Sequence, residues 1–455
     1  AAGRPYLVME RYGATTLRGV GTLKRYDDLY SILAQLLDAL AHAHARDVVH
    51  RDLKPGNVLV AMTDDGSPLV KLTDFGIARA LDVPDRHGEL LPTSATGTPG
   101  YMAPEQIVGD VGAQGPWTDL YALGCLAHRL ATGAVPYSDA GDDDAVIAAH
   151  LTDMLPPIEL RFPVPMGFDA WLRKMLSKRS AHRFVRAADA LYALTMLGGA
   201  RTTAPRPGPS DAPRVTLHTA ATLIPDDYVE ETIDDMETFP VPGARDAPPI
   251  PLSWRERASR DRQRHELLGV GLGLYGLRPI PLVGRETERD RIWEMLHIVA
   301  EESHPAVVVL HGGAGHGKTR LAQWMAQRAH ELGSATILHA THDVSPTPHD
   351  GIEGMLLRHF RAAGLGRAAL ARHLASEVGD DELAAALTNV IVPDKAAEGT
   401  TGSYERFRAI TSFLRFQSLT RPVMLVFDDV HYGAQALGLV EHLLRGRDAR
   451  ILAVL

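Results

Sequence analysis

The chain has 455 residues, a length that fits two or three domains, and its 45% hydrophobic and 23% charged residues are typical of globular proteins. Acidic residues outnumber basic ones by 56 to 47, which excludes the overall basic field that suits nucleic acid binding. The single cysteine, Cys125, excludes an internal disulfide framework and a cysteine-rich zinc site.

Neither a membrane span nor a signal peptide is predicted. No apolar run approaches the roughly 20 residues that cross a bilayer, and the N-terminus lacks a basic stretch followed by an apolar one. We therefore expect a cytoplasmic protein. Because the chain begins without methionine and stops within what reads as a strand, we also expect a fragment that is truncated at both ends.

The first zone, residues 1–195, alternates apolar-periodic segments with turns. Residues 28–45 have the spacing of a helix with one buried face. Apolar runs at 58–60 and 70–72 predict two short strands that are separated by a Gly-Ser-Pro turn. Residues 119–132 are almost wholly apolar, which predicts a helix that is buried on all sides.

Three motifs follow in this zone. The sequence HRDLKPGN occupies residues 50–57, Asp-Phe-Gly occupies 74–76, and Ala-Pro-Glu occupies 103–105. In this order and context the motifs resemble the eukaryotic-type protein kinases, in their bacterial serine/threonine branch. The resemblance covers the whole zone and implies the large, mainly α-helical C-terminal lobe of a protein kinase domain.

The chemistry of phosphoryl transfer explains the residue types. Asp52 can accept the proton of the substrate hydroxyl, and Lys54 can neutralise charge on the transferred phosphoryl group. Asn57 and Asp74 offer oxygen ligands for Mg²⁺, which bridges the phosphates of ATP. By resemblance, a lysine two residues after the catalytic aspartate marks a serine/threonine kinase, so the expected partners are proteins with Ser or Thr acceptors.

The resemblance also implies structural roles. Glu105 is expected to pair with Arg183, Asp119 to hold the backbone of the catalytic loop, and His50 to lie in the core. Arg51 is expected to bind a phosphate on the activation segment between Asp-Phe-Gly and Ala-Pro-Glu. The candidate phosphosites on that segment are Thr93, Ser94 and Thr96. The alternative for each of them is a solvated loop hydroxyl.

Other parts of the kinase pattern are not found. No Gly-rich loop and no strand lysine precede residue 6, so we expect the small N-terminal lobe to be missing. Residues 6–10 look like the last strand of that lobe and the hinge, with Glu10 and Tyr12 beside the adenine of ATP. Since the catalytic-loop residues are intact, we expect an active parent protein and an inactive isolated fragment.

The second zone, residues 196–278, is rich in Pro, Thr, Asp and Arg, which predicts a largely disordered linker. The basic patch 255–264, which follows Trp254, has two interpretations, a solvated helix face or a docking element. Weaker candidates for autophosphorylation in the linker are Thr222, Thr232 and Thr238.

The third zone, residues 279–455, alternates strands with amphipathic helices, which predicts an α/β domain with a parallel sheet. A strand at 306–310 runs into GGAGHGKT at 312–319 and then into a helix, as a P-loop requires. Lys318 is expected to reach the β- and γ-phosphates, and Thr319 to bind Mg²⁺. The glycines expected at the phosphates are Gly312, Gly315 and Gly317.

A second acidic element completes the expected nucleotide site. The strand 423–427 ends in Asp428, expected in the Mg²⁺ shell, and Asp429, the candidate general base for ATP hydrolysis. Together with PLVGRETER at 281–289, these residues resemble the AAA-like signalling ATPases. The resemblance implies an incomplete P-loop domain whose partner-binding region would follow residue 455, and it leaves ATP hydrolysis open.

Two hypotheses of function remain open. In the first, a serine/threonine kinase transfers the γ-phosphate of ATP to proteins and is coupled to a regulatory P-loop ATPase switch in signal transduction. In the alternative, the first zone is a pseudokinase-type scaffold and the P-loop domain is the part that binds nucleotide. Phosphate transfer to protein distinguishes them.

Overall fold

The computed structural model describes residues 15–20, 23–62, 67–75, 98–110, 112–197, 202–203, 248–256, 282–345, 347, 350–393, 403–446 and 448–455. The chain divides into two compact units, Ala1–Leu40 with Val49–Gly243 and Ala41–Val48 with Ala244–Leu455. Within the described residues, no helix combines the length and the apolar character that crossing a membrane requires.

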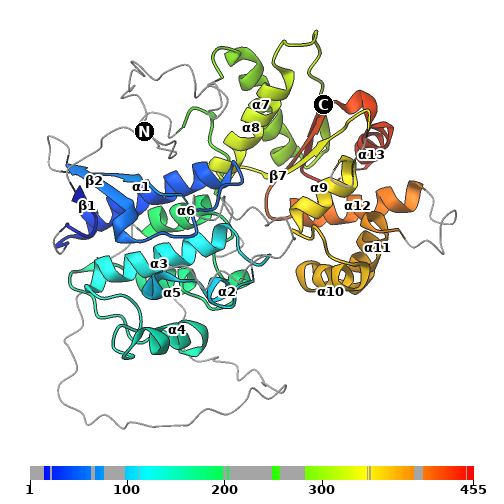
Figure 1. Ribbon diagram of the computed structural model, residues 1–455. Helices are drawn as coiled ribbons and strands as arrows, with labels where there is room; N and C mark the ends of the chain where they lie inside the picture. Colours follow the sequence, from blue (N-terminus) through cyan, green and yellow to red (C-terminus); the bar gives the residue numbers. More distant parts are fainter. Residues whose placement is uncertain are drawn as a thin grey trace, which may run out of the picture. The chain divides into compact units, whose positions relative to one another are not determined.

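The first unit is mainly α-helical (Figure 1). Its helices are α1 Tyr26–His44, whose residues up to Leu40 belong to this unit, α2 Pro104–Ile107, α3 Pro116–Thr132, α4 Asp143–Thr152, α5 Phe168–Met175 and α6 Ala187–Leu197. Proline begins α3, where a missing N–H costs nothing, and Gly133 ends it with a φ of 92°. Its side chains are buried almost all round, which confirms the buried helix predicted at 119–132.

This unit also contains an antiparallel sheet in the order β1-β2-β3. Its strands are β1 Thr15–Thr16, β2 Val58–Met62 and β3 Pro68–Leu72, and a separate pair joins β4 Val164–Pro165 to β5 Thr202–Thr203. The first unit is mainly helical as expected, but the expectation that the small, sheet-containing N-terminal lobe is missing is wrong, because an antiparallel sheet is present. The two predicted short strands, β2 and β3, pair as a hairpin. Thr15–Thr16 pairs with the other edge of β2, and no local sequence pattern predicted this strand.

The second unit is an α/β layer structure around a parallel sheet with the order β6-β9-β8-β7. The strands are β6 Ala306–Val308, β7 Thr336–Thr341, β8 Val423–Asp428 and β9 Ile451–Val454. The helices are α7 Glu286–Glu302, α8 Lys318–Glu331, α9 Gly351–His359, α10 Arg367–Val378, α11 Asp381–Ile391, α12 Ser403–Ser418 and α13 Ala434–Arg445. The predicted parallel α/β fold is confirmed.

Successive side chains of β8 point to opposite faces of this sheet and so contact different helices. Leu425 and Phe427 point into a core with α9, α12 and α13, whereas Met424 and Val426 point into a core with α7 and α8. The two helical layers are visible on the two sides of the strands in Figure 1. Since all four strands are parallel, the loops that follow β6 and β8 lie at the same edge of the sheet.

A segment within the expected linker is packed against this unit. Residues 248–256 run along α7 and α8. Trp254 is 8% exposed, and its ring lies perpendicular to that of Trp324, with the two ring centroids 5.2 Å apart. Trp254 Nε1 donates to Asp290 at 2.7 Å, and Trp293 Nε1 donates to the Pro251 carbonyl at 2.8 Å. Because residues 255 and 256 belong to this segment, these contacts favour the docking interpretation for the start of the basic patch. The rest of the patch, and the linker threonines, lie outside the described residues.

Trp254→Ala is expected to lower the free energy of unfolding of the second unit by about 3–5 kcal/mol, because it removes a large buried side chain and leaves a cavity between α7 and α8. Urea unfolding of the whole chain, followed by hydrogen exchange of the β8 amides, measures the change. Leu252→Ala is the control, since Leu252 is 89% exposed and its truncation should have almost no effect. Equal effects of the two variants would show that the segment is not part of this unit.

Candidate active site and nucleotide site

The β2–β3 hairpin brings the first two motifs together. Val58 pairs with Leu72, so Asn57, which precedes β2, and Thr73, which follows β3, lie at the same end of the hairpin. Thr73 N–H donates to the Asn57 carbonyl at 3.0 Å. His50 is fully buried, its Nε2 lies 3.0 Å from the Thr73 carbonyl, and its ring centroid lies 4.7 Å from that of Phe75. Antiparallel pairing therefore builds the framework of the site.

Asp52 lies at the centre of a polar cluster in this loop. Lys54 Nζ donates to Asp52 Oδ2 at 2.7 Å. Asn57 Nδ2 donates to the same oxygen at 3.0 Å and to the Asp52 carbonyl at 2.8 Å. The side chains of Asp52 and Lys54 remain 35% and 26% exposed. A carboxylate that is oriented by an amide and a cation, and is open to solvent, can accept a proton from an incoming hydroxyl group.

Asp119, in the first turn of α3, holds the backbone of this loop. It is 1% exposed, and its two carboxylate oxygens accept from the N–H groups of His50 and Arg51, each at 2.8 Å. Arg51 has a φ of 65°, in the left-handed region that a non-glycine residue rarely adopts. Two charge-assisted hydrogen bonds, which the backbone donates to a buried carboxylate, offset the cost of this conformation.

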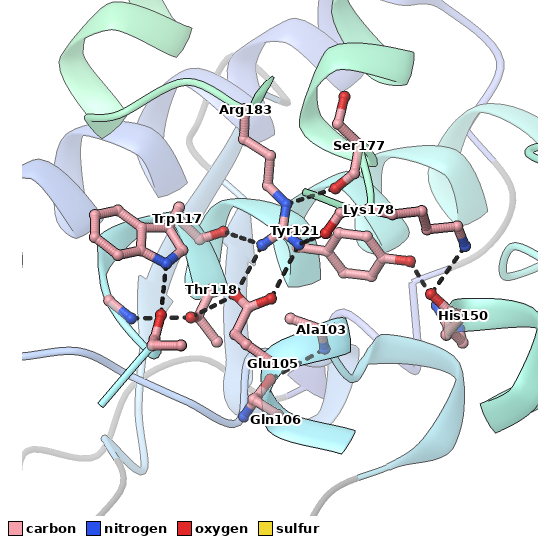
Figure 2. Close-up of polar contacts among 12 residues, drawn as sticks. Ala103, Glu105, Gln106, Trp117, Thr118, Tyr121, His150, Ser177, Lys178 and Arg183 are labelled. Carbon is pink, nitrogen blue, oxygen red and sulfur yellow. Dashed lines mark hydrogen bonds and ion pairs between the residues drawn. The ribbon is translucent and has the colours of Figure 1, made fainter. Parts of the chain in front are cut away.

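Glu105 and Arg183 form a bidentate ion pair (Figure 2). The Nη1–Oε1 distance is 2.8 Å and the Nη2–Oε2 distance is 3.0 Å. Arg183 also donates to the Ser177 and Lys178 carbonyls, and Thr118 Oγ1 donates to Glu105 Oε1 at 2.7 Å. The pair expected from the sequence is thus present, and it fixes α2 to the helical core.

The donors near Asp52 fit a magnesium ion chemically. Asn57 uses its amide nitrogen towards Asp52, so its other terminal atom is a carbonyl oxygen, and Asp74 is an exposed carboxylate. Both are hard oxygen ligands. The described residues contain no group of three or more His, Cys, Asp or Glu that could hold a metal ion. Mg²⁺ at this site would therefore depend on phosphate oxygens and water for its other ligands.

The glycine-rich loop of the second unit lies between β6 and α8. Gly315 and Gly317 both have a φ of 77°, and a side chain at either would meet nothing within 4 Å. Glycine is therefore required by the backbone conformation and not by lack of space. Lys318 Nζ donates to the carbonyls of Gly312 at 2.9 Å and Gly313 at 3.0 Å, so the ammonium group is held over the loop.

The two acidic residues after β8 lie beside the start of α8. Thr319 Oγ1 donates to Asp428 Oδ1 at 2.7 Å, although the two residues are 109 positions apart. Asp429 follows with a φ of 51°, and its N–H donates to the same oxygen at 3.2 Å. A hydroxyl and a carboxylate in contact beside a glycine-rich loop form a suitable ligand pair for Mg²⁺.

Two protein families match different parts of the chain. Residues 3–187 match the protein kinase domain, and residues 281–455 match the AAA ATPase domain. The chain contains a protein kinase domain followed by an AAA ATPase domain.

Bacterial serine/threonine-protein kinases are similar to the kinase domain. Pkn1 of Myxococcus xanthus is 39% identical over 188 residues, which are 41% of this chain and 26% of that protein. PknD of Mycobacterium tuberculosis is 40% identical over 194 residues, or 41% and 27% of the two chains. A probable PknB of Bifidobacterium longum is 33% identical over 192 residues, or 41% and 26%. The matched part thus spans about a quarter of each relative.

Some expected site residues are not among those described. Glu10 and Tyr12 of the expected hinge, and the phosphosite candidates Thr93, Ser94 and Thr96, lie outside the described residues. Conversely, the kinase domain contains polar residues near the Ala-Pro-Glu motif that the sequence analysis missed. They are Gln106, Thr118, Tyr121, His150 and Lys178 (Figure 2). Gln106 directly follows the motif, but nothing in one sequence distinguishes the others from surface polar residues.

His150 should make the kinase domain sensitive to acid. Burial, and then the charge of Lys178, lower the pKa of His150 from 6.5 to about 4, and Tyr121 Oη lies 2.8 Å from its Nδ1. Between these pH values the unfolded chain binds a proton that the folded domain does not. The contribution of neutral His150 to stability is therefore fully present above about pH 6.5. It is lost as the pH falls towards 4, which lowers the free energy of unfolding by on the order of 3 kcal/mol.

Urea unfolding of the kinase domain at several pH values between 7 and 4.5 measures this loss. In His150→Asn the amide oxygen still accepts from Tyr121, but nothing titrates, so the variant should lose less stability over this range than the wild type. If the free energy of unfolding changed with pH to the same extent in the two proteins, the prediction would be contradicted.

Proposed function

We propose that the kinase domain transfers the γ-phosphate of ATP to serine or threonine hydroxyls of proteins. The contact of Lys54 and Asn57 with the same partly exposed oxygen of Asp52 carries this proposal. In the proposed mechanism, Asp52 orients the acceptor hydroxyl and takes its proton, and Lys54 neutralises charge on the phosphoryl group as it is transferred. Relatives that are named serine/threonine-protein kinases support the same acceptor class.

Asn57 and Asp74 are the proposed ligands of Mg²⁺ in this domain. Bound Mg²⁺ would neutralise charge on the phosphates of ATP. The contributions of the chain itself are the orientation of the Asn57 amide by Asp52 and the placement of Asp74 at the end of the hairpin.

Arg51 is the proposed partner of a phosphate on the activation segment, with Thr93, Ser94 or Thr96 as the modified residue. Its Nε is buried and has no hydrogen-bond partner among the described residues. A buried guanidinium N–H without a partner is unfavourable, and a phosphate oxygen would satisfy it. Phosphorylation would then attach the segment to the catalytic loop.

For the AAA ATPase domain we propose a nucleotide-dependent switch that regulates the kinase. In this proposal the loop at Gly312, Gly315 and Gly317 and the ammonium group of Lys318 bind the phosphates. Thr319 and Asp428 hold Mg²⁺, and Asp429 is the candidate base for hydrolysis. The Thr319–Asp428 contact supports this proposal. We place the kinase at 1–195, the linker at 196–278 and the ATPase at 279–455, with residues 248–256 of the linker docked on the ATPase.

Transfer of radiolabel from γ-labelled ATP to a protein acceptor, followed by phosphoamino acid analysis, tests the kinase proposal. We expect phosphoserine or phosphothreonine and no phosphotyrosine. Asp52→Asn is the matched control, because it removes the proposed base and leaves the P-loop of the second domain intact, so labelling of the acceptor should fall. Absence of protein labelling from the wild-type chain would contradict the proposal and favour the scaffold alternative.

A further inference from the structure

Gln106 connects the Ala-Pro-Glu segment to the catalytic loop. Its Nε2 donates to the Arg51 carbonyl at 2.8 Å, and its Oε1 accepts from the Ala103 N–H at 3.2 Å. The partners decide which end of the amide is which, because a carbonyl oxygen needs a donor and an N–H group needs an acceptor. Gln106 is 6% exposed and Ala103 is fully buried, so water does not readily replace either bond.

The carbonyl that Gln106 holds belongs to the peptide bond between Arg51 and Asp52. The N–H of that same peptide lies 3.3 Å from His50 Nδ1, and the Arg51 N–H is bound by Asp119. Arg51 has a φ of 65°, which a non-glycine residue rarely adopts, so its backbone would not keep this conformation unaided. Each of these hydrogen bonds helps to hold it there. The orientation of this peptide determines the direction in which the Asp52 side chain leaves the backbone.

Gln106 can hold the loop because α2 is itself fixed. The neighbouring Glu105 forms the buried ion pair with Arg183, whose side chain has no exposed surface (Figure 2). Two adjacent residues of α2 thus have different partners. Glu105 attaches the helix to the core, and Gln106 attaches the catalytic loop to the helix.

We infer that Gln106 is a positioning residue, through which the end of the activation segment sets the position of Asp52. The inference rests on the proposed kinase function. It predicts that the donor N–H of this side chain affects the chemical step more than the binding of ATP, because the side-chain hydrogen bonds described for Gln106 go to Ala103 and Arg51.

Gln106→Glu tests the role of the donor. The carboxylate has almost the same shape and still accepts from the Ala103 N–H, but it places an oxygen without a proton against the Arg51 carbonyl. We expect kcat for protein phosphorylation to fall about tenfold or more, with a much smaller change in KM for ATP. As the pH is lowered, activity relative to wild type should recover, because a protonated glutamate can donate again.

Gln35→Glu is the matched control. Gln35 of α1 makes the same kind of bridge, since its Nε2 donates to the Pro68 carbonyl at 2.9 Å and its Oε1 accepts from the Val70 N–H at 3.1 Å. These contacts lie in the part of β3 away from Asp74. The control should lose stability but keep the wild-type kcat and show no recovery of activity at lower pH.

Amide hydrogen exchange of residues 50–57 provides a second measurement, which does not depend on activity. Faster exchange in Gln106→Glu than in Gln35→Glu supports the inference. Equal loss of kcat in the two variants, or unchanged exchange and kcat in Gln106→Glu, overturns it. If the wild-type chain transfers no phosphate, the proposed function fails, and the exchange of residues 50–57 still decides whether Gln106 holds the loop.

Discussion

Asp52→Asn is expected to lower kcat for protein phosphorylation by about 10²–10⁴-fold, which is the usual contribution of a positioned general base. The amide is almost the same size as the carboxylate, and its oxygen can still accept from Lys54 and Asn57. What the variant loses is the ability to take the proton of the acceptor hydroxyl. Steady-state kinetics with a serine or threonine peptide measure the effect, and ATP binding should change little.

The control for this experiment is Asp169→Asn, at an exposed carboxylate of the same domain. Asp169 pairs with Arg173 at 2.8 Å and its side chain is 51% exposed, so the substitution removes one negative charge away from the catalytic loop. Its kcat should match the wild type. If Asp52→Asn retained kcat within about twofold of this control, Asp52 would not be the proton acceptor.

Arg183→Met is expected to destabilise the kinase domain by about 3–5 kcal/mol, because it leaves the Glu105 carboxylate buried without its cation. The Arg183 side chain is fully buried and that of Glu105 is 8% exposed, so water cannot replace the lost contacts. Three backbone carbonyls that accept from the guanidinium, those of Trp117, Ser177 and Lys178, also lose a donor. The midpoint and slope of urea unfolding measure the loss.

Two further variants distinguish a buried charge from a lost packing contact. Glu105→Leu combined with Arg183→Met should recover part of the stability, because no uncompensated charge then remains. Arg25→Met breaks an ion pair whose side chains are 69% and 73% exposed, and it should cause no measurable change. If Arg183→Met were as mild as Arg25→Met, the Glu105–Arg183 pair would not anchor α2.

Several features of the structure could be predicted directly from patterns and motifs in the sequence. The parallel α/β unit, the buried helix at 119–132, and the Glu105–Arg183 pair could be predicted because each depends on a residue pattern or a recurring motif. The glycines before Lys318 are required by backbone conformation, which is a local property. The roles assigned to Asp52, Asp428 and the other site residues remain predictions for the experiments above.

Other features could not be predicted because they depend on partners far away in the chain. Thr15–Thr16 is a strand because the edge of β2 is available to it. Composition averaged over residues 196–278 predicted disorder, but residues 248–256 pack on α7 and α8, where Trp254 is buried among side chains of both helices. A local sequence window does not contain those helices.

The sequence by itself determined the two families, the order of their domains and the residues proposed for chemistry, because those residues lie in short motifs whose spacing the chemistry requires. Apart from Asp119, which the kinase motifs already indicated, only the tertiary structure decided which groups hold them in place. The bond from Gln106 to Arg51 and the contact of Thr319 with Asp428 join residues 55 and 109 positions apart. Such contacts exist because packed helices and paired strands bring the residues together, and that packing is a property of the whole fold.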